Sequence, residues 1–144
     1  MRVLIVEDDP DDAELLIQEL RRGGYEPISR RVDTPEAMHA ALDESVWDVI
    51  AADYSMPGFT GIEALRIMQE RGLDLPFLLV SGTVGEDVAV EAIKAGAHDY
   101  LMKDRLARLA SAIEREIGQA ESRKERRRSE NILRAVFESA LEGA

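Results

Sequence analysis

Short apolar runs alternate with segments of helical periodicity along most of this chain. Runs with the length and composition of strands lie at residues 2–6, 27–32, 46–52, 76–81 and 99–102. Residues 10–22, 35–42, 61–70 and 86–95 carry apolar residues at helical spacing, and a last helix is expected from about Leu106. Five strand–helix units in a row predict an α/β fold: a doubly wound, five-stranded parallel sheet with helices on both faces.

The composition supports one compact domain and excludes several classes of protein. The 144 residues are 45% hydrophobic, enough for a core, and the absence of cysteine excludes disulfides and thiolate metal sites. The sequence shows no secretion signal and no apolar run long enough for membrane insertion, so a cytoplasmic location is expected. The net charge of −11 argues against a nucleic-acid partner, and the basic residues at 123–128 alternate with glutamates as on a solvated helix face.

Polar residues collect where the predicted strands end. Glu7 and Asp8 follow the first run, Asp53 the third, Ser81 the fourth and Lys103 the fifth. In parallel sheets of this kind, ligands bind outside the carboxyl ends of the strands. In the strand order 2-1-3-4-5 the first and third strands are neighbours. We therefore expect Glu7, Asp8 and Asp53 to lie together, flanked by Ser81 and Lys103.

Such a cluster contains the groups needed to hold a phosphoryl group. Like charges raise one another's pKa, and a hard divalent cation such as Mg²⁺ resolves the repulsion between neighbouring carboxylates. A lysine adds a positive charge, a serine adds a hydroxyl donor, and an aspartate can act as nucleophile. Taken singly, each residue also has an ordinary role, as a helix cap, a turn residue or an exposed lysine.

Four segments in order resemble the response-regulator receiver domain of two-component signalling, which has a flavodoxin-like fold. The segments are Val3–Pro10, Asp53-x-x-Met56-Pro57-x-x-x-Gly61, Val80-Ser81-Gly82 and Ala95–Lys103. The resemblance covers about residues 2–116, and we expect a receiver domain over residues 1–118. It implies a signalling module that catalyses only its own phosphorylation and dephosphorylation.

The resemblance implies a role for each acid at the site. Asp53 would accept a phosphoryl group from a histidine of a partner kinase or of a phosphotransfer protein. Mg²⁺ would be the cofactor, bound by Asp8 directly, by Glu7 through water, by Asp53, and by the backbone carbonyl of Ser55. Gly61 would allow the tight entry into the following helix.

The resemblance also implies a phosphate-binding group and a switch. Ser81, the backbone amide of Gly82 and Lys103 would bind the phosphoryl oxygens. Ser81 would then move inward, and the ring of Tyr100 would fill the space that it leaves.

Two features depart from the family's pattern. Asp104 stands where the family usually has proline, so we expect a trans peptide bond after Lys103 and a weaker pull of Lys103 on the phosphate. Residues 81–87 are rich in glycine, which predicts looser coupling between the phosphate and the fourth helix.

The tail, residues 119–144, is predicted to form a long signalling helix. Residues 119–131 are almost wholly polar, and an apolar set follows: Ile132, Leu133, Val136, Phe137, Ala140 and Leu141. We expect a homodimer through the last receiver helices and this helix. Residues 132–144 also resemble the entry helix of a PAS sensor domain.

Three other readings fit the same fold. A phosphatase-like hydrolase would want a second acid two residues after Asp53, where this chain has Ser55. A flavin or nucleotide carrier would want a phosphate-cradling loop after the first strand, where this chain has acids. A constitutive interaction module without phosphorylation is favoured only by Asp104.

Overall fold

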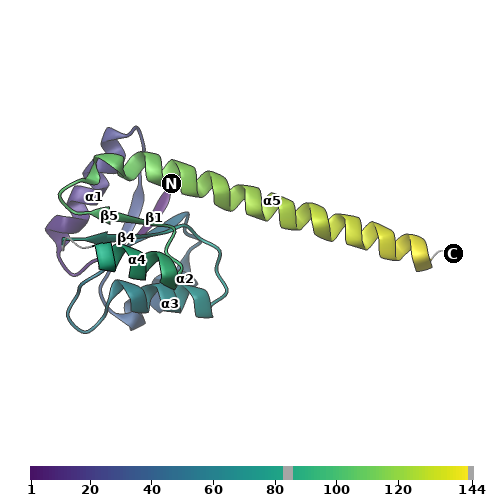
Figure 1. Ribbon diagram of the computed structural model, residues 1–144, viewed down its shortest axis with the longest axis horizontal. Helices are drawn as coiled ribbons and strands as arrows, with labels where there is room; N and C mark the ends of the chain where they lie inside the picture. The colour runs from purple at the N-terminus through teal and green to yellow at the C-terminus, as the bar shows by residue number, and fades with distance from the viewer. Residues whose placement is uncertain (83–85, 143–144) are drawn as a thin grey trace.

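A five-stranded parallel sheet in the order β2-β1-β3-β4-β5 forms the centre of the computed structural model, which describes residues 1–82 and 86–142 (Figure 1). The strands are β1 (Arg2–Val6), β2 (Ile28–Val32), β3 (Val49–Asp53), β4 (Phe77–Ser81) and β5 (Asp99–Met102). The helices are α1 (Pro10–Arg22), α2 (Pro35–Glu44), α3 (Gly61–Glu70), α4 (Glu86–Ala95), the 3₁₀ turn η1 (Leu106–Arg108) and α5 (Leu109–Glu142). The predicted fold class and strand order are confirmed.

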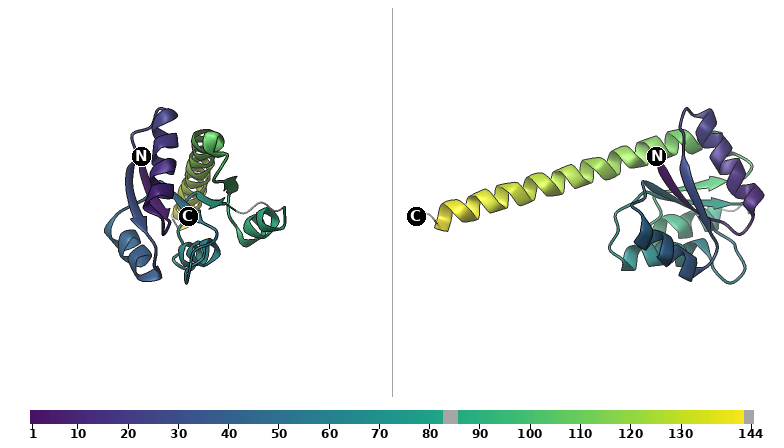
Figure 2. Two further views of the ribbon diagram at one scale, coloured as in Figure 1. Left: turned by 90° about the vertical axis from the view of Figure 1, so that its left-hand side faces the viewer. Right: turned by 180° about the vertical axis from the view of Figure 1, so that it is seen from behind.

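Helices cover both faces of the sheet, and alternate strand residues point into two separate cores (Figure 2). On one face Ile5 and Val80 pack with α1 and α5, and on the other Leu4 and Leu79 pack with α2 and α3. All five residues of β3 and of β4 are buried. This explains why the central strands read as continuous apolar runs rather than as alternating ones.

The predicted bounds of the third strand were wrong at its start. Val46 is 83% exposed, and the indole N–H of Trp47 donates to the carbonyl of Ala41 in α2 at 2.9 Å. Residues 46–48 therefore connect α2 to β3, and the strand begins at Val49. Asp53 is the last residue of β3 rather than the first residue after it. Strand β4 ends at Ser81, as the predicted run 76–81 does.

Gly61 sits where the chain turns from β3 into α3 with no room for a side chain. A Cβ there would lie 2.4 Å from Cδ2 of Leu79 and 2.6 Å from the carbonyl oxygen of Asp53. The first turn of α3 therefore packs directly against the end of β3, as the sequence predicted. Met56 and Phe59 are buried in the loop between and hold it against the core.

Helix α5 continues far beyond the sheet that it covers (Figure 1). The last buried residue of the helix is Ala120. About one and two turns later, Arg123 and Arg127 pair with Asp74 in the α3–β4 loop. The hydrogen bonds from Arg123 and the nearby charge of Arg127 outweigh partial burial and lower the pKa of Asp74. These pairs fix the direction in which the helix leaves the domain.

None of the helices in the described ranges is both long and apolar enough to cross a membrane.

Candidate functional site

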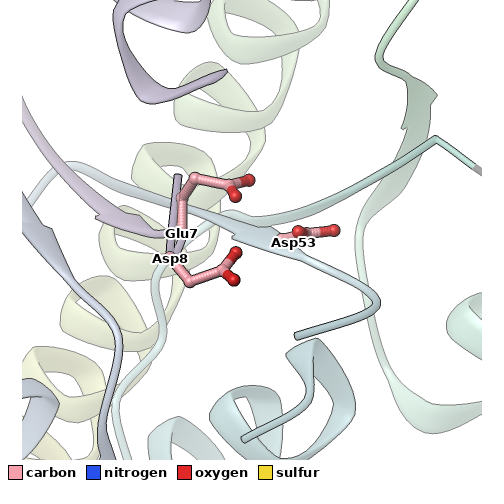
Figure 3. Close-up of side chains that lie close together, drawn as sticks. All are labelled: Glu7, Asp8 and Asp53. Carbon is pink, nitrogen blue, oxygen red and sulfur yellow. The ribbon is translucent and has the colours of Figure 1, made fainter. Parts of the chain in front are cut away.

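Three carboxylates meet at the carboxyl end of the sheet. Strands β1 and β3 pair in register, with Val6 opposite Ala52, so Glu7 and Asp8 follow β1 beside the place where Asp53 ends β3. Ligand oxygens of the three acids all lie within 4.8 Å of one another (Figure 3). Glu7 and Asp53 are 1% and 5% exposed, whereas Asp8 is open to solvent. The juxtaposition predicted from the strand ends is present.

The ammonium of Lys103 reaches this cluster from the end of β5. Its Nζ lies 3.1 Å from Oδ2 of Asp53, 3.2 Å from Oε2 of Glu7 and 2.7 Å from Oδ2 of Asp12. The backbone of Lys103 is anchored as well, because its N–H donates to the carbonyl of Ser81 at 2.8 Å. Burial by itself would lower the pKa of Lys103, but the hydrogen bonds to Asp12 and Asp53 outweigh burial and raise it.

Glu7 has a raised pKa at this site. Burial is the main cause, and it raises the pKa of Glu7 from 4.5 to about 7. The backbone N–H of Asp9, which donates to Oε1 of Glu7 at 3.1 Å, opposes that rise, and the negative charge of Asp53 adds to it. More positive charge would therefore stabilise the ionised cluster.

The donor set fits a hard divalent cation. Glu7, Asp8 and Asp53 offer only carboxylate oxygens, which are the ligands that Mg²⁺ prefers, and they converge from two strand ends without a nitrogen or sulfur donor in the group. The N–H of Ser55 donates to Oδ1 of Asp53 at 3.2 Å, so this loop residue contacts the cluster. A role for its carbonyl in metal binding stays a prediction.

The residues predicted to bind phosphate surround Lys103. Ser81 is fully buried at the end of β4, and Gly82 follows it at the surface. A Cβ at Gly82 would lie 3.8 Å from Cδ of Lys103, which places this backbone beside the lysine. Tyr100 is half-buried and packs against the core on the α2–α4 face. The prediction of a loose segment at residues 81–87 falls largely on residues 83–85, which lie outside the described residues.

Sequence reasoning missed two contacts of this site. One is the ion pair between Asp12 and Lys103, which joins residues 91 positions apart. The other is the hydrogen bond from the hydroxyl of Tyr54, the residue after Asp53, to Oε2 of Glu91 in α4 at 2.9 Å. Asp12 reads in sequence as an ordinary acid in the first turn of a helix, and nothing in the spacing indicates which way it faces.

Asp104 is not among the acids that pair with Lys103 in the described part of the chain, and its predicted effect on the phosphate stays a prediction. The peptide bond after Lys103 is trans, as expected. Asp104 is exposed, however, and the carboxylate that pairs with Lys103 from outside the cluster is that of Asp12. The carboxylate from outside the cluster that contacts the lysine thus comes from α1.

Known proteins are similar to this chain in sequence and in fold. The family model for the response regulator receiver domain matches residues 3–114. The response regulator protein FleR of Pseudomonas aeruginosa is 38% identical over 107 residues, which are 74% of this chain and 22% of FleR. The transcriptional regulatory protein PrrA of Mycobacterium tuberculosis is 34% identical over 102 residues, 71% of this chain and 43% of PrrA.

A solved receiver domain matches as well. The signal receiver domain of a signal transduction histidine kinase from Syntrophus aciditrophicus has a TM-score of 0.68 and 27% identity, covering 82% of this chain and 90% of that one.

The doubly wound sheet with an acidic cluster and a lysine at its carboxyl end fits a phosphorylation-based signalling domain. Among such domains, this chain belongs to the response regulator receiver domain family. The chain spans less than half the length of the two regulators named above. The activities of those whole proteins are therefore not assigned to this chain.

The raised pKa of Glu7 predicts how the stability of the metal-free protein changes with pH. The folded state binds the Glu7 proton more tightly than the unfolded state, so the resulting stabilisation is complete below pH 4.5 and is lost as the pH rises through about 7. Between about pH 5 and about pH 8, wild type should lose about 1–3 kcal/mol of unfolding free energy relative to Glu7→Gln.

Urea unfolding of both proteins in the presence of a chelator measures this difference. Glu36→Gln, a change at an exposed glutamate in the first turn of α2, is the control and should run parallel to wild type. If the difference in unfolding free energy between wild type and Glu7→Gln stays constant over this pH range, the raised pKa of Glu7 is contradicted.

Proposed function

We propose that this chain is a phosphoacceptor module whose Asp53 receives a phosphoryl group from a histidine of a kinase or of a phosphotransfer protein. The observation that supports it most strongly is the position of Asp53. Its carboxylate ends a central strand, lies in the acidic cluster and is 3.1 Å from the ammonium of Lys103. Membership of the receiver family supports the same role.

The transfer itself needs few groups from the protein. A carboxylate oxygen of Asp53 attacks phosphorus, the bond from phosphorus to the donor's imidazole nitrogen breaks, and the imidazole keeps that electron pair. Lys103 donates to one phosphoryl oxygen, and the hydroxyl of Ser81 and the N–H of Gly82 donate to others. Hydrolysis by water later returns Asp53 to its carboxylate.

The same proposal assigns the metal ligands. Glu7, Asp8, Asp53 and the carbonyl of Ser55 would hold Mg²⁺, which supplies positive charge against the phosphoryl oxygens and the carboxylates. The residue two positions after Asp53 is Ser55 rather than a second acid. We therefore expect turnover of the chain's own phosphoryl group only, and not of outside substrates.

The signal is proposed to pass through Ser81 and Tyr100. Phosphorylation would draw the Ser81 hydroxyl toward the phosphoryl group, and the ring of Tyr100 would occupy the vacated space. Support comes from placement: Ser81 ends β4, and Tyr100 lies on the neighbouring strand β5 and packs partly against the core on the α2–α4 face.

The rival reading, a constitutive interaction module, rests on Asp104. No hydrogen bond or ion pair joins Asp104 to Lys103 within the described ranges.

We divide the chain into a receiver domain, residues 1–118, and a signalling helix, residues 119–144, and we propose a homodimer through the last receiver helices and α5. Five large apolar side chains of α5 are more than half exposed: Ile132, Leu133, Val136, Phe137 and Leu141. Apolar area of this kind on a projecting helix favours a partner helix.

The remaining expectations stay predictions. The family match ends at residue 114 and gives the resemblance of residues 132–144 to a PAS entry helix no support. A cytoplasmic location and the absence of a nucleic-acid partner also stay predictions.

Asp53→Asn tests the phosphoacceptor role. Wild type incubated with acetyl phosphate and Mg²⁺ should gain one acid-labile phosphoryl group, seen by mass spectrometry, because the nucleophile and its charge-neutralising groups are in place. Asp53→Asn should gain none. Asp48→Asn, at an acid that caps the start of β1 through the N–H of Arg2, is the matched control and should be labelled like wild type. Labelling of Asp53→Asn to the wild-type level would exclude the role.

Leu133→Glu with Phe137→Glu tests the homodimer. Light scattering should give wild type the mass of two chains and the double variant the mass of one, since two charges in a buried helix interface are costly. Asn131→Glu, on the opposite side of α5 at 100° per residue, should stay dimeric. A monomeric wild type, or a variant that still dimerises, would rule the helix out as the interface.

A further inference from the structure

Lys103 has its shortest contact with an acid that is not part of the metal-binding group. Oδ2 of Asp12 is 2.7 Å from Nζ, against 3.1 Å for Asp53 and 3.2 Å for Glu7. Asp12 lies in the first turn of α1, which is fixed by the hydrogen bond from the N–H of Asp11 to Oδ1 of Asp9 at 2.9 Å. The Asp12 carboxylate is therefore held on the side of Lys103 that faces α1.

The surroundings of this pair strengthen it. The side chains of Asp12 and Lys103 are 32% and 25% exposed. Apolar groups from three elements border the pair: Leu15 and Leu16 of α1, Val80 of β4 and Leu106 of η1. An ion pair next to apolar side chains is less screened than one at an open surface, so Asp12 is a stronger partner for the ammonium than a typical surface carboxylate.

Acids already engage two of the three N–H donors of the Lys103 ammonium. A lysine has three N–H donors and no acceptor. Here two of them bond to Asp12 and Asp53, and the ammonium also pairs with Glu7. When Asp53 is phosphorylated, a phosphoryl oxygen can replace the Asp53 carboxylate as a partner of the Lys103 ammonium. Asp12 still contacts the same ammonium and competes with that oxygen. It also adds negative charge to a site that already holds four carboxylates and one lysine.

We infer that Asp12 is a positioning residue that competes with the phosphoryl group for Lys103 and so weakens the hold of the acceptor site on that group. The inference rests on the proposed function, because it concerns the same site. It assigns Asp12 no contact with phosphorus. Its effect is to share the charge of Lys103 between two anions.

Beryllofluoride, a phosphoryl mimic that binds carboxylates, tests the inference in the whole chain. Its affinity in saturating Mg²⁺ is measured by ¹⁹F NMR for wild type and for Asp12→Asn. Removing the competing charge should tighten binding about twofold to fivefold, the range expected for a partly exposed ion pair. Asp12→Glu, which keeps a carboxylate at this position, should bind like wild type.

Two further variants separate this role from a general effect of charge or of folding. Asp11→Asn removes the same charge from the same helical turn without a contact to Lys103 in the described part of the chain, and its affinity should equal that of wild type. In a Lys103→Met background, Asp12→Asn should give no gain in affinity, because the shared ammonium is gone.

The outcomes distinguish the two proposals. A wild type that binds no beryllofluoride overturns the proposed function. A wild type that binds, with Asp12→Asn unchanged or weaker, overturns only the role of Asp12. Equal tightening by Asp11→Asn or by Asp12→Glu, or a gain in the Lys103→Met background, also overturns it, because Asp12 would then act without Lys103.

Discussion

Parallel pairing of β1 with β3 forces acids from two distant parts of the sequence to one edge of the sheet. Once Val6 is opposite Ala52, Glu7 and Asp53 are adjacent whatever their mutual repulsion. Both are buried, and burial together with the charge of Asp53 raises the pKa of Glu7. Burying carboxylates that repel one another lowers the stability of the fold. The hydrophobic burial of β3 and β4 must therefore offset this loss. A site held in this way gains by binding a cation.

The same strand ends connect the site to the rest of the molecule. Lys103 contacts the acids and is followed, after one short loop, by η1 and α5. Helix α5 then runs along the sheet and leaves it beside Asp74, which precedes β4 and so lies at the opposite end from the acids. Lys103 thus lies one short loop before a helix whose far part projects from the domain. Because Arg123 and Arg127 hold that helix to Asp74, it would move with the domain rather than independently of it.

How well the site could be predicted depended on where each residue lies in its element. The carboxyl ends of parallel strands meet at one edge, so the position of Glu7, Asp8, Asp53, Ser81 and Lys103 at four apolar run ends was enough to bring them together. A helical residue has no such rule. Asp12 reaches Lys103 because of the face that α1 turns toward the end of β5. That orientation depends on packing between residues far apart in sequence.

The errors in the element bounds have the same origin. Val46 belongs to the apolar run before β3, but Trp47 turns inward to bond α2, and this tertiary contact overrides the strand propensity of the run. The long helix was predictable because residues 109–142 lack proline and keep helical periodicity near both ends. Its pairing with Asp74 was not, since an Asp in a loop and two arginines in a mixed-charge segment carry no signal of contact.

The central claim is that Glu7, Asp8 and Asp53 form one cation site, and paramagnetic NMR tests it most directly. Traces of Mn²⁺, which takes the same oxygen ligands as Mg²⁺, broaden the amide signals of residues near a bound ion. The account predicts selective broadening around residues 7–9 and 53–55, reversed by excess Mg²⁺ and absent from Asp8→Asn. Broadening spread over the acidic surface, or centred elsewhere and unaffected by Asp8→Asn, would contradict it.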